Sequence, residues 1–298
     1  MTSLEDFLRP TQKHLFKRLA KKFKGKTLIS KGNFILVRGS APVLLVAHLD
    51  TVHEKPVQVI CKSDDSNILM SPQGIGGDDR CGVFALYKIH QSAQIKPWLL
   101  FCCDEEIGGL GANAFCLAHQ LHQLPNELDQ LKFLIELDRK GKNDAVFYHC
   151  ANPDFETYIT GKGFQTTQGS FSDISLIAPE LGIAAVNLSC GYYHAHTRHE
   201  YINHDELNTT INKVIDIIGD SSKLPRFEYA EDIKHFEPRK AIRRVSSFPL
   251  SSKLPAELQD IYEFLLDIYS VNELETFRAE LGDHILWQIY YDEIAPFY

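Results

Sequence analysis

Acidic and histidine side chains recur in five short segments that lie at or beyond the ends of apolar runs. The segments are AHLDTV (47–52), GIGGDDRCG (74–82), CCDEEIGG (102–109), IELDRKG (135–141) and GYYHAHTRHEY (191–201). Several carboxylates brought close together repel one another and raise each other's pKa, and metal ions remove that problem. Two histidines and three carboxylates without a cysteine suit Zn²⁺, or another borderline divalent ion such as Mn²⁺ or Co²⁺. The residue types therefore predict a metal centre in which two ions share a bridging carboxylate and activate a water for hydrolysis.

The adjacent acids Glu105 and Glu106 suggest a division of labour within this centre. A hydrolytic site needs one carboxylate that holds no metal and moves a proton. Two neighbouring acids that follow the apolar run WLLFCC are costly unless they are used. The pair therefore supplies one metal ligand and one general base.

Buried strands alternate with helices along the first 220 residues, and these elements must position the polar segments. The expected strands are 43–47, 98–103, 133–137, 145–149 and 183–188, and the expected helices are 11–24, 79–93, 110–122, 153–158 and 206–218. A hairpin is expected at 57–70. The alternation predicts an α/β fold with an open, mostly parallel sheet and helices on both faces. Sites form at the carboxyl ends of the strands in such a sheet, so distant segments converge there.

The composition changes after Asp220, where a basic, Ser- and Pro-rich stretch begins. We expect a catalytic domain at 1–220, a linker at 221–255 and a small helical appendage at 256–298, where apolar residues return at helical spacing. The basic residues of the linker are expected to be solvated. An anion-binding contact is their alternative role.

Composition and charge exclude several classes of function. The net charge of −8 disfavours a broad electrostatic contact with nucleic acid, so no nucleic-acid partner is expected. No apolar run approaches the roughly 18 residues that a membrane span needs, and the start of the chain is not a secretory signal. The seven cysteines mostly lie in apolar runs without CxxC spacing. They indicate reduced thiols and hence a cytoplasmic protein.

Taken in order, AHLDTV, the DDRxG element, DEEIGG, an Asp after an apolar strand and HTxxE resemble the motifs of the di-zinc exopeptidase superfamily. That superfamily includes bacterial leucyl aminopeptidases, peptidase T, the tetrahedral aminopeptidases and the acetylornithine deacetylase group. The resemblance covers roughly residues 40–220 and implies two divalent ions, with zinc favoured and Mn or Co as alternatives. The roles carried over by motif are His48 and Asp138 on one metal, Glu106 and His196 on the other, Asp78 as the bridge, Glu105 as general base and Asp50 as the acid that orients His48.

Three assignments have alternatives that the sequence leaves open. Asp79 could bridge in place of Asp78, although we expect Asp79 to be the N-cap or a first-turn acid of the following helix. His194 could ligate in place of His196. Tyr192 or the next tyrosine could donate a hydrogen bond to the developing oxyanion.

Spacing between the motifs limits the domain content. Thirty residues separate His48 from Asp78, and 58 separate Asp138 from His196. These gaps are too short for the inserted domains of peptidase T, the deacetylases or the tetrahedral aminopeptidases. The chain is therefore expected to be a bare catalytic domain, closest in layout to the single-domain aminopeptidases.

The resulting functional hypothesis is an exopeptidase, most directly an aminopeptidase that acts on short peptides. The alternative is a deacylase or carboxypeptidase that acts on N-acyl amino acids or C-terminal residues. It needs a cation for the substrate carboxylate, and four cations flank the motifs, namely Arg80, Arg139, Lys140 and Arg198. A non-catalytic binding scaffold is a second alternative, and the complete ligand set argues against it.

Overall fold

The computed structural model describes residues 3–30, 32–53, 55–169 and 171–231, together with Leu274 and Arg278. Most of the expected linker at 221–255 and almost all of the expected appendage at 256–298 lie outside the described residues. Contacts between Cα atoms divide the chain into two units, residues 1–105 with 109–232 and residues 106–108 with 233–298. The helices and strands given below belong to the first unit.

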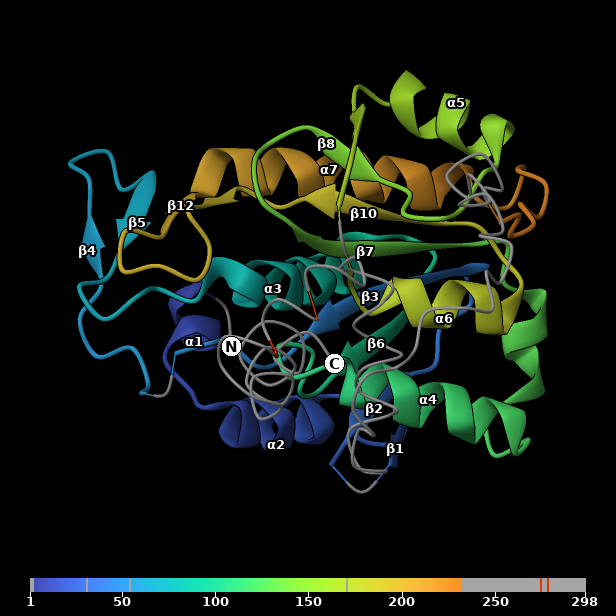
Figure 1. Ribbon diagram of the computed structural model, residues 1–298, viewed down its shortest axis with the longest axis horizontal. Coiled ribbons are helices and arrows are strands. Elements are labelled where there is room, and N and C mark those ends of the chain that lie inside the picture. Colours follow the sequence, from blue (N-terminus) through green and yellow to red (C-terminus); the bar gives the residue numbers. More distant parts are fainter. Residues whose placement is uncertain are drawn as a thin grey trace. The chain divides into compact units, whose positions relative to one another are not determined.

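An eight-stranded sheet with the order β1-β2-β6-β3-β7-β10-β8-β9 forms the centre of the first unit (Figure 1). Its strands are β1 (Thr27–Ser30), β2 (Phe34–Val37), β6 (Trp98–Cys102), β3 (Val43–His48), β7 (Phe133–Arg139), β10 (Ala185–Ser189), β8 (Asp144–Val146) and β9 (Gln165–Thr167). The four central strands β6, β3, β7 and β10 are parallel to one another. Strands β2 and β8 pair with this block in the antiparallel sense. The predicted open, mostly parallel α/β sheet is confirmed.

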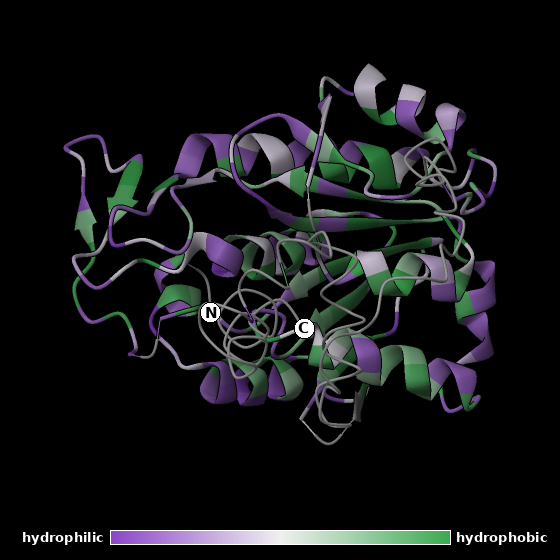
Figure 2. Ribbon diagram, in the orientation of Figure 1, coloured by the Kyte–Doolittle hydropathy of each residue, from purple (hydrophilic) through white to green (hydrophobic). Residues whose placement is uncertain are grey.

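Helices cover both faces of this sheet, and each face has its own hydrophobic cluster. One face carries α1 (Glu5–Leu8), α2 (Gln12–Lys22), α3 (Gly77–Ser92), α5 (Pro153–Gly161) and α7 (His204–Asp220). The other carries α4 (Leu110–Gln120) and α6 (Ile174–Leu181), with the 3-10 helix η1 (Asn126–Gln130) beside them. Figure 2 shows hydrophobic strands between helices whose outer sides are hydrophilic. Because the central strands are buried on both faces, they are continuous apolar runs, which made them predictable.

Local capping explains where the two most amphipathic helices begin. The Thr11 side chain accepts a hydrogen bond from the backbone of His14 at the start of α2, and Leu15 and Leu19 face the core. The Asn203 side chain caps α7 in the same way. Such caps satisfy backbone N–H groups that a helix start leaves without partners.

A second, four-stranded antiparallel sheet lies beside the main one and has the order β11-β12-β5-β4. It contains β11 (Tyr192–Tyr193), β12 (Tyr201–Asn203), β5 (Ile68–Met70) and β4 (Cys61–Lys62). The β4–β5 pair is the expected hairpin. Strands β11 and β12 join the hairpin to the histidine-rich segment, because residues 194–200 form the connection between them.

Some elements differ from the expectations. Neither α6 nor β9 was expected from the sequence. Helix α6 is a nearly uniform apolar run with Pro179 inside it, so it lacks a helical pattern. Residues 221–231 belong to the first unit, where the Phe227 side chain is buried and the Phe227 backbone N–H donates to the backbone carbonyl of Lys132. In the described part of the chain, no helix combines the length and the hydrophobicity that crossing a membrane requires.

Candidate active site

His48, the last residue of β3, is the centre of a cluster of acids and is fully buried. Its Nδ1 lies 3.2 Å from Oδ1 of Asp50. Its Nε2 lies 3.1 Å from Oδ1 of Asp78, 3.5 Å from Oδ1 of Asp138 and 3.9 Å from Oε2 of Glu105. Burial lowers the pKa of His48, but the charges of Asp138 and Asp50 outweigh burial and raise it well above its usual value. One imidazole thus touches four of the predicted site residues.

Asp78 lies between the two histidines that the sequence assigned to different metals. Its Oδ1 contacts His48, and its Oδ2 lies 3.2 Å from Nε2 of His196. Burial favours the protonated form, yet hydrogen bonds from both histidines hold the pKa of Asp78 far below its usual value. A carboxylate that faces two histidines with separate oxygens has the geometry of a bridging ligand.

Asp79, the alternative bridge, makes different contacts. Its Oδ2 accepts a hydrogen bond from the backbone of His48, and its Oδ1 accepts one from the backbone of Gly82 at 2.9 Å. Asp79 lies in the first turn of α3, one of the two positions expected for it. The geometry therefore favours Asp78 over Asp79 as the bridge.

Asp138, near the end of β7, is held by a shell of hydrogen bonds. The Tyr192 hydroxyl donates to its Oδ1 at 3.2 Å, and the Ser172 hydroxyl lies 3.1 Å from its Oδ2. The side-chain oxygen of Asn187 accepts from the Asp138 backbone. Burial and the charge of Asp78 raise the pKa of Asp138 to about 7.

The Glu105–Glu106 pair lies in the loop between β6 and α4. The Glu105 backbone N–H donates to Oδ1 of Asp50 at 3.1 Å, and its side chain faces His48. Glu106 lies in the second unit, and its role as a metal ligand stays a prediction.

His196 and His194 both lie on the β11–β12 connection with positive φ angles. The ring of His194 packs 5.8 Å from the ring of Tyr201, whereas His196 reaches Asp78. About half of the His196 side chain is exposed. Of the two histidines, His196 is the one that the geometry places with the other candidate ligands.

The donor set fits a metal ion. His48, Asp79 and Asp138 form a group whose ligand atoms lie within 4.8 Å of one another. Imidazole with carboxylates and no thiolate is a set that Zn²⁺, Mn²⁺ and Co²⁺ accept. Burial raises the pKa of Asp79 well above its usual value, with further increases from the charges of Asp138 and Asp78. Carboxylates packed this closely ionise together only beside positive charge.

Sequence reasoning missed three buried polar residues, Ser172, Asp173 and Glu136, of which Ser172 contacts Asp138. The Ser172 hydroxyl also lies 2.5 Å from Glu136, a fully buried acid two residues before Asp138. Asp173 next to Ser172 is fully buried as well, and burial raises its pKa to about 6. The only available signal was that Glu136 interrupts an apolar strand on the same face as Asp138.

The two tyrosines considered as oxyanion donors have other partners. The Tyr192 hydroxyl is bound to Asp138, and the Tyr193 hydroxyl donates to Glu206 at 2.5 Å. Tyr192 therefore helps to hold a candidate ligand, and Tyr193 points away from the cluster.

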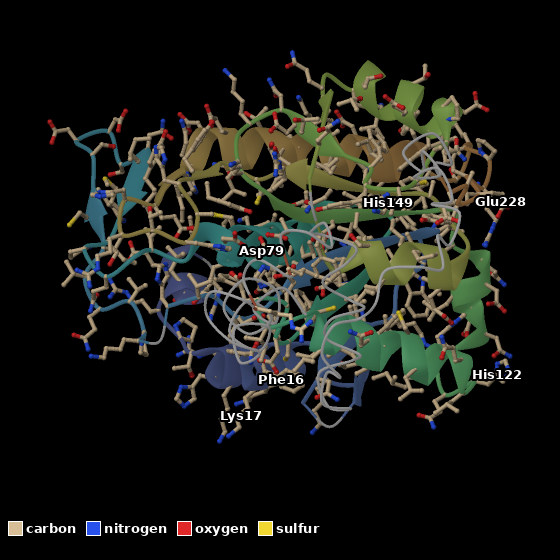
Figure 3. The ribbon with its side chains drawn as sticks, viewed as in Figure 1. Phe16, Lys17, Asp79, His122, His149 and Glu228 are labelled. Atoms are coloured by element: carbon tan, nitrogen blue, oxygen red, sulfur yellow. The ribbon has the colours of Figure 1, made fainter. Side chains whose placement is uncertain are left out.

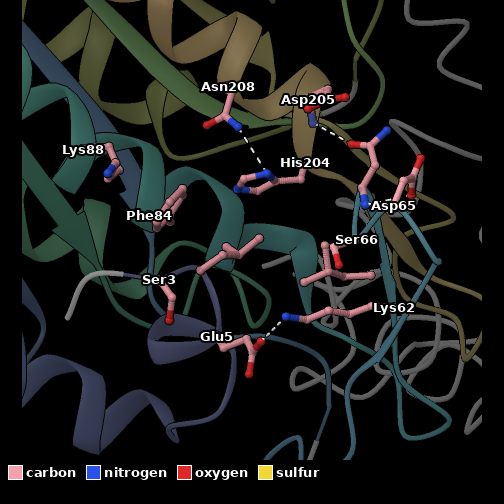
Figure 4. Close-up of a pocket in the computed structure, with 13 residues that line it drawn as sticks. Ser3, Glu5, Lys62, Asp65, Ser66, Phe84, Lys88, His204, Asp205 and Asn208 are labelled. Carbon is pink, nitrogen blue, oxygen red and sulfur yellow. Dashed lines mark hydrogen bonds and ion pairs between the residues drawn. The ribbon is translucent and has the colours of Figure 1, made fainter.

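Two further histidines and one cavity are not part of this cluster. In Figure 3 the buried Asp79 lies near the middle of the view, and His149 and His122 lie to its right. His122 and His149 are both exposed. A cavity of about 530 Å³ contains none of the candidate site residues, and its Glu5 and Lys62 side chains pair with each other (Figure 4).

Comparisons with known proteins agree with this fold. No model of a known protein family matches the chain. A "probable carboxypeptidase" of Emericella nidulans is 28% identical over 189 residues, which cover 58% of this chain and 43% of the relative. The match thus spans less than half of that relative's length.

Solved structures give a broader likeness. The aminopeptidase PepT of Bacillus cereus and a tripeptidase of Staphylococcus aureus each have a TM-score of 0.56 with 16% identity. Each alignment covers 74% of this chain and 97% of the other chain. An aminopeptidase of the archaeon Desulfurococcus kamchatkensis has a TM-score of 0.52 with 14% identity, covering 72% and 93%. The fold is therefore that of these peptidases, and the predicted resemblance is confirmed at the level of the fold.

Proposed function

We propose that this chain is a metal-dependent exopeptidase, most directly an aminopeptidase that acts on short peptides. The observation that carries the proposal is the position of Asp78 between His48 and His196, at 3.1 Å and 3.2 Å. Separate oxygens of one carboxylate face two imidazoles, which is the arrangement that a shared metal ligand requires. The peptidases with this fold support the reaction class.

The proposed centre holds two divalent ions, and zinc is the favoured metal. His48 and Asp138 would hold one ion, Glu106 and His196 the other, and Asp78 would bridge them. When bound, such ions polarise a scissile carbonyl and lower the pKa of an attacking water.

The remaining roles belong to the chain's own acids. Glu105 accepts the proton of the attacking water and passes it to the leaving amine. Asp50 orients the His48 ring and at the same time holds the Glu105 backbone. Tyr192 and Ser172 fix the Asp138 carboxylate, since both lie within hydrogen-bond distance of it.

The second candidate is cleavage at the carboxyl end or removal of an N-acyl group, and the relative named as a carboxypeptidase favours it. Both reactions need a cation that binds the substrate carboxylate. Arg80 is unsuited, because it is buried and donates to the carbonyls of Phe7 and Pro10. Arg139 donates to the carbonyl of Gln168. Of the four flanking cations, Lys140 and Arg198 remain for this role.

A substrate screen with purified protein separates the two candidates. The protein is loaded in turn with Zn²⁺, Mn²⁺ and Co²⁺ and offered aminoacyl, N-acyl and dipeptide substrates. Release of N-terminal residues supports the aminopeptidase. Exclusive hydrolysis of N-acyl or C-terminal bonds supports the second candidate. No hydrolysis by a metal-loaded protein would favour a non-catalytic scaffold.

The proposal includes a cytoplasmic location and a separate C-terminal appendage. All seven cysteines are free thiols, and six of them are buried. Reduced, buried thiols are typical of proteins from reducing compartments.

A further inference from the structure

A buried carboxylate that the proposed chemistry does not use lies at the end of the β11–β12 connection. The Glu200 side chain is 1% exposed. A buried charge is costly unless hydrogen bonds and opposite charges satisfy it. The contacts of Glu200 show which groups stabilise this buried carboxylate.

Both oxygens of Glu200 accept hydrogen bonds from residues 74–78, which run into the first turn of α3 and are called the 74–78 loop here. The backbone N–H of Asp78 donates to Oε1 at 2.9 Å, and the backbone N–H of Gly76 donates to Oε2 at 2.9 Å. Nε2 of His53 lies 3.2 Å from the same Oε2. A carboxylate with several such donors fixes the position of the backbone that supplies them.

The glycines of this loop allow it to wrap around the Glu200–His53 pair. Gly76 has a φ of +66°, a conformation that residues with a Cβ rarely adopt. A Cβ on Gly77 would lie 3.2 Å from Oε1 of Glu200 and 2.7 Å from the side chain of Tyr192. A Cβ on Gly74 would lie 2.1 Å from the His53 ring. Glycine at positions 74, 76 and 77 therefore allows the loop to pass close to Glu200 and His53.

One short segment thus does two things for the candidate centre. It supplies His196, whose Nε2 lies 3.2 Å from the Asp78 carboxylate. Four residues later it supplies Glu200, which holds the Asp78 backbone. The β11–β12 connection therefore contacts Asp78 twice, at its carboxylate through His196 and at its backbone N–H through Glu200.

We infer that Glu200 is a positioning residue that holds the bridging Asp78 in place for metal binding. The inference rests on the proposed function, because it takes Asp78 as the shared ligand. Glu200 touches neither substrate nor metal, and it acts through the loop at 74–78. Residues that orient a metal ligand typically contribute 10–100-fold in metal affinity.

The test compares three variants in the full chain. Glu200→Gln keeps one acceptor oxygen but replaces the other with an amide that cannot accept. Glu200→Asp keeps the charge but withdraws it by one methylene from the loop. Glu206→Gln is the matched control, since the Glu206 carboxylate accepts a hydrogen bond from the Tyr193 hydroxyl.

The primary measurement is Zn²⁺ affinity by chelator competition, with thermal unfolding of the metal-free proteins beside it. We expect both Glu200 variants to unfold cooperatively and to bind Zn²⁺ roughly 10–100-fold more weakly than wild type. Glu206→Gln is expected to bind as wild type does. Folded Glu200 variants with wild-type affinity would overturn the inference. If Glu200→Asp binds Zn²⁺ as tightly as wild type and Glu200→Gln does not, only the charge at this position matters. That result would overturn the positioning role.

A measurement on the unmodified protein covers the case in which the variants do not fold. In metal-free wild type, the amide hydrogens of Gly76 and Asp78 must exchange slowly, because Glu200 accepts both. Exchange at the rate of an open loop would overturn the inference. Metal binding without peptidase activity would refute only the proposed function, and a wild type that binds no metal would refute both.

Discussion

The carboxylate of Asp50 accepts a hydrogen bond from the backbone N–H of Glu105, which lies 3.1 Å away and 55 residues later in the sequence. The same oxygen lies 3.2 Å from the ring of His48. Asp50 therefore connects a candidate metal ligand to the candidate general base. The sequence predicted the contact of Asp50 with His48, whereas only the structure shows its contact with Glu105.

Replacing Asp50 should therefore impair both metal binding by His48 and proton transfer by Glu105. We expect Asp50→Ala to lower Zn²⁺ affinity roughly 10–100-fold, the range typical of residues that orient a metal-binding histidine. Turnover at saturating metal should also fall, because the Glu105 backbone loses its acceptor. Metal titration followed by steady-state kinetics measures the two effects separately.

Asp65→Asn is the control for this prediction, because Asp65 is an exposed acid of the β4–β5 hairpin. It should change neither quantity. If metal restores Asp50→Ala to full turnover, Asp50 acts on His48 alone and its contact with Glu105 has no catalytic effect.

Glu105 and Glu106 should respond differently to the same substitution. Glu105→Gln keeps the shape of the side chain but cannot accept a proton, so turnover should fall by roughly 10²–10⁴-fold at unchanged metal content. KM should change little, because the lost interaction belongs to the transition state. Glu106→Gln should lose metal and recover in part when metal is added in excess.

The paired measurement is metal content and kcat for both variants, with Glu127→Gln as a control at an exposed ion pair. Surface pairs of this kind contribute little to stability. The opposite pattern, in which Glu105→Gln loses metal and Glu106→Gln keeps it, would exchange the two roles.

The sequence predicted the central sheet and the candidate ligands because both depend on local patterns. Strands β3, β6 and β7 are apolar runs, and each ends in or just before a polar motif. The supporting contacts were not predictable, since they join distant residues. Glu200 holds the backbone of Asp78 across 122 positions, and Ser172 meets Asp138 across 34. Strands of two and three residues, such as β11 and β12, are also too short to show a periodicity.

The boundary of the catalytic domain can be tested by truncation at two positions. Phe227 is buried and lies 5.1 Å from the ring of Phe155 and 6.0 Å from that of Phe133. A chain cut after Glu231 should remain folded and bind metal, because every proposed ligand precedes the cut. A chain cut after Leu224 should be less stable, by about the 3–5 kcal/mol typical of losing a buried phenylalanine.

Urea unfolding of both truncations and of Phe227→Ala in the full chain measures this difference. Phe227→Ala should reproduce most of the loss seen after the cut at Leu224. If the chain cut after Glu231 is insoluble, the residues after the cut complete the core. The proposal of a separate appendage would then be wrong.

Gln12, at the start of α2, is expected to affect the candidate base from outside the site. Its amide donates to Oδ1 of Asp104 at 2.7 Å, and the Asp104 backbone N–H donates back to its carbonyl at 3.2 Å. Asp104 directly precedes Glu105 and has a φ of +59°. A residue with a Cβ holds this conformation only when its surroundings stabilise it, at a cost on the order of 1–3 kcal/mol. The reciprocal pair therefore stabilises the backbone that presents Glu105.

Gln12→Ala should lower kcat roughly fivefold, the factor that corresponds to a lost hydrogen-bond contribution of about 1 kcal/mol. Metal content and KM should stay at their wild-type values, since Gln12 contacts no candidate ligand. Lys13→Ala is the matched control on the exposed side of the same helix. Glycine accepts a positive φ without strain, so adding Asp104→Gly should restore part of the lost kcat. If Gln12→Ala instead lowers metal content, α2 stabilises the whole centre and not the Glu105 backbone in particular.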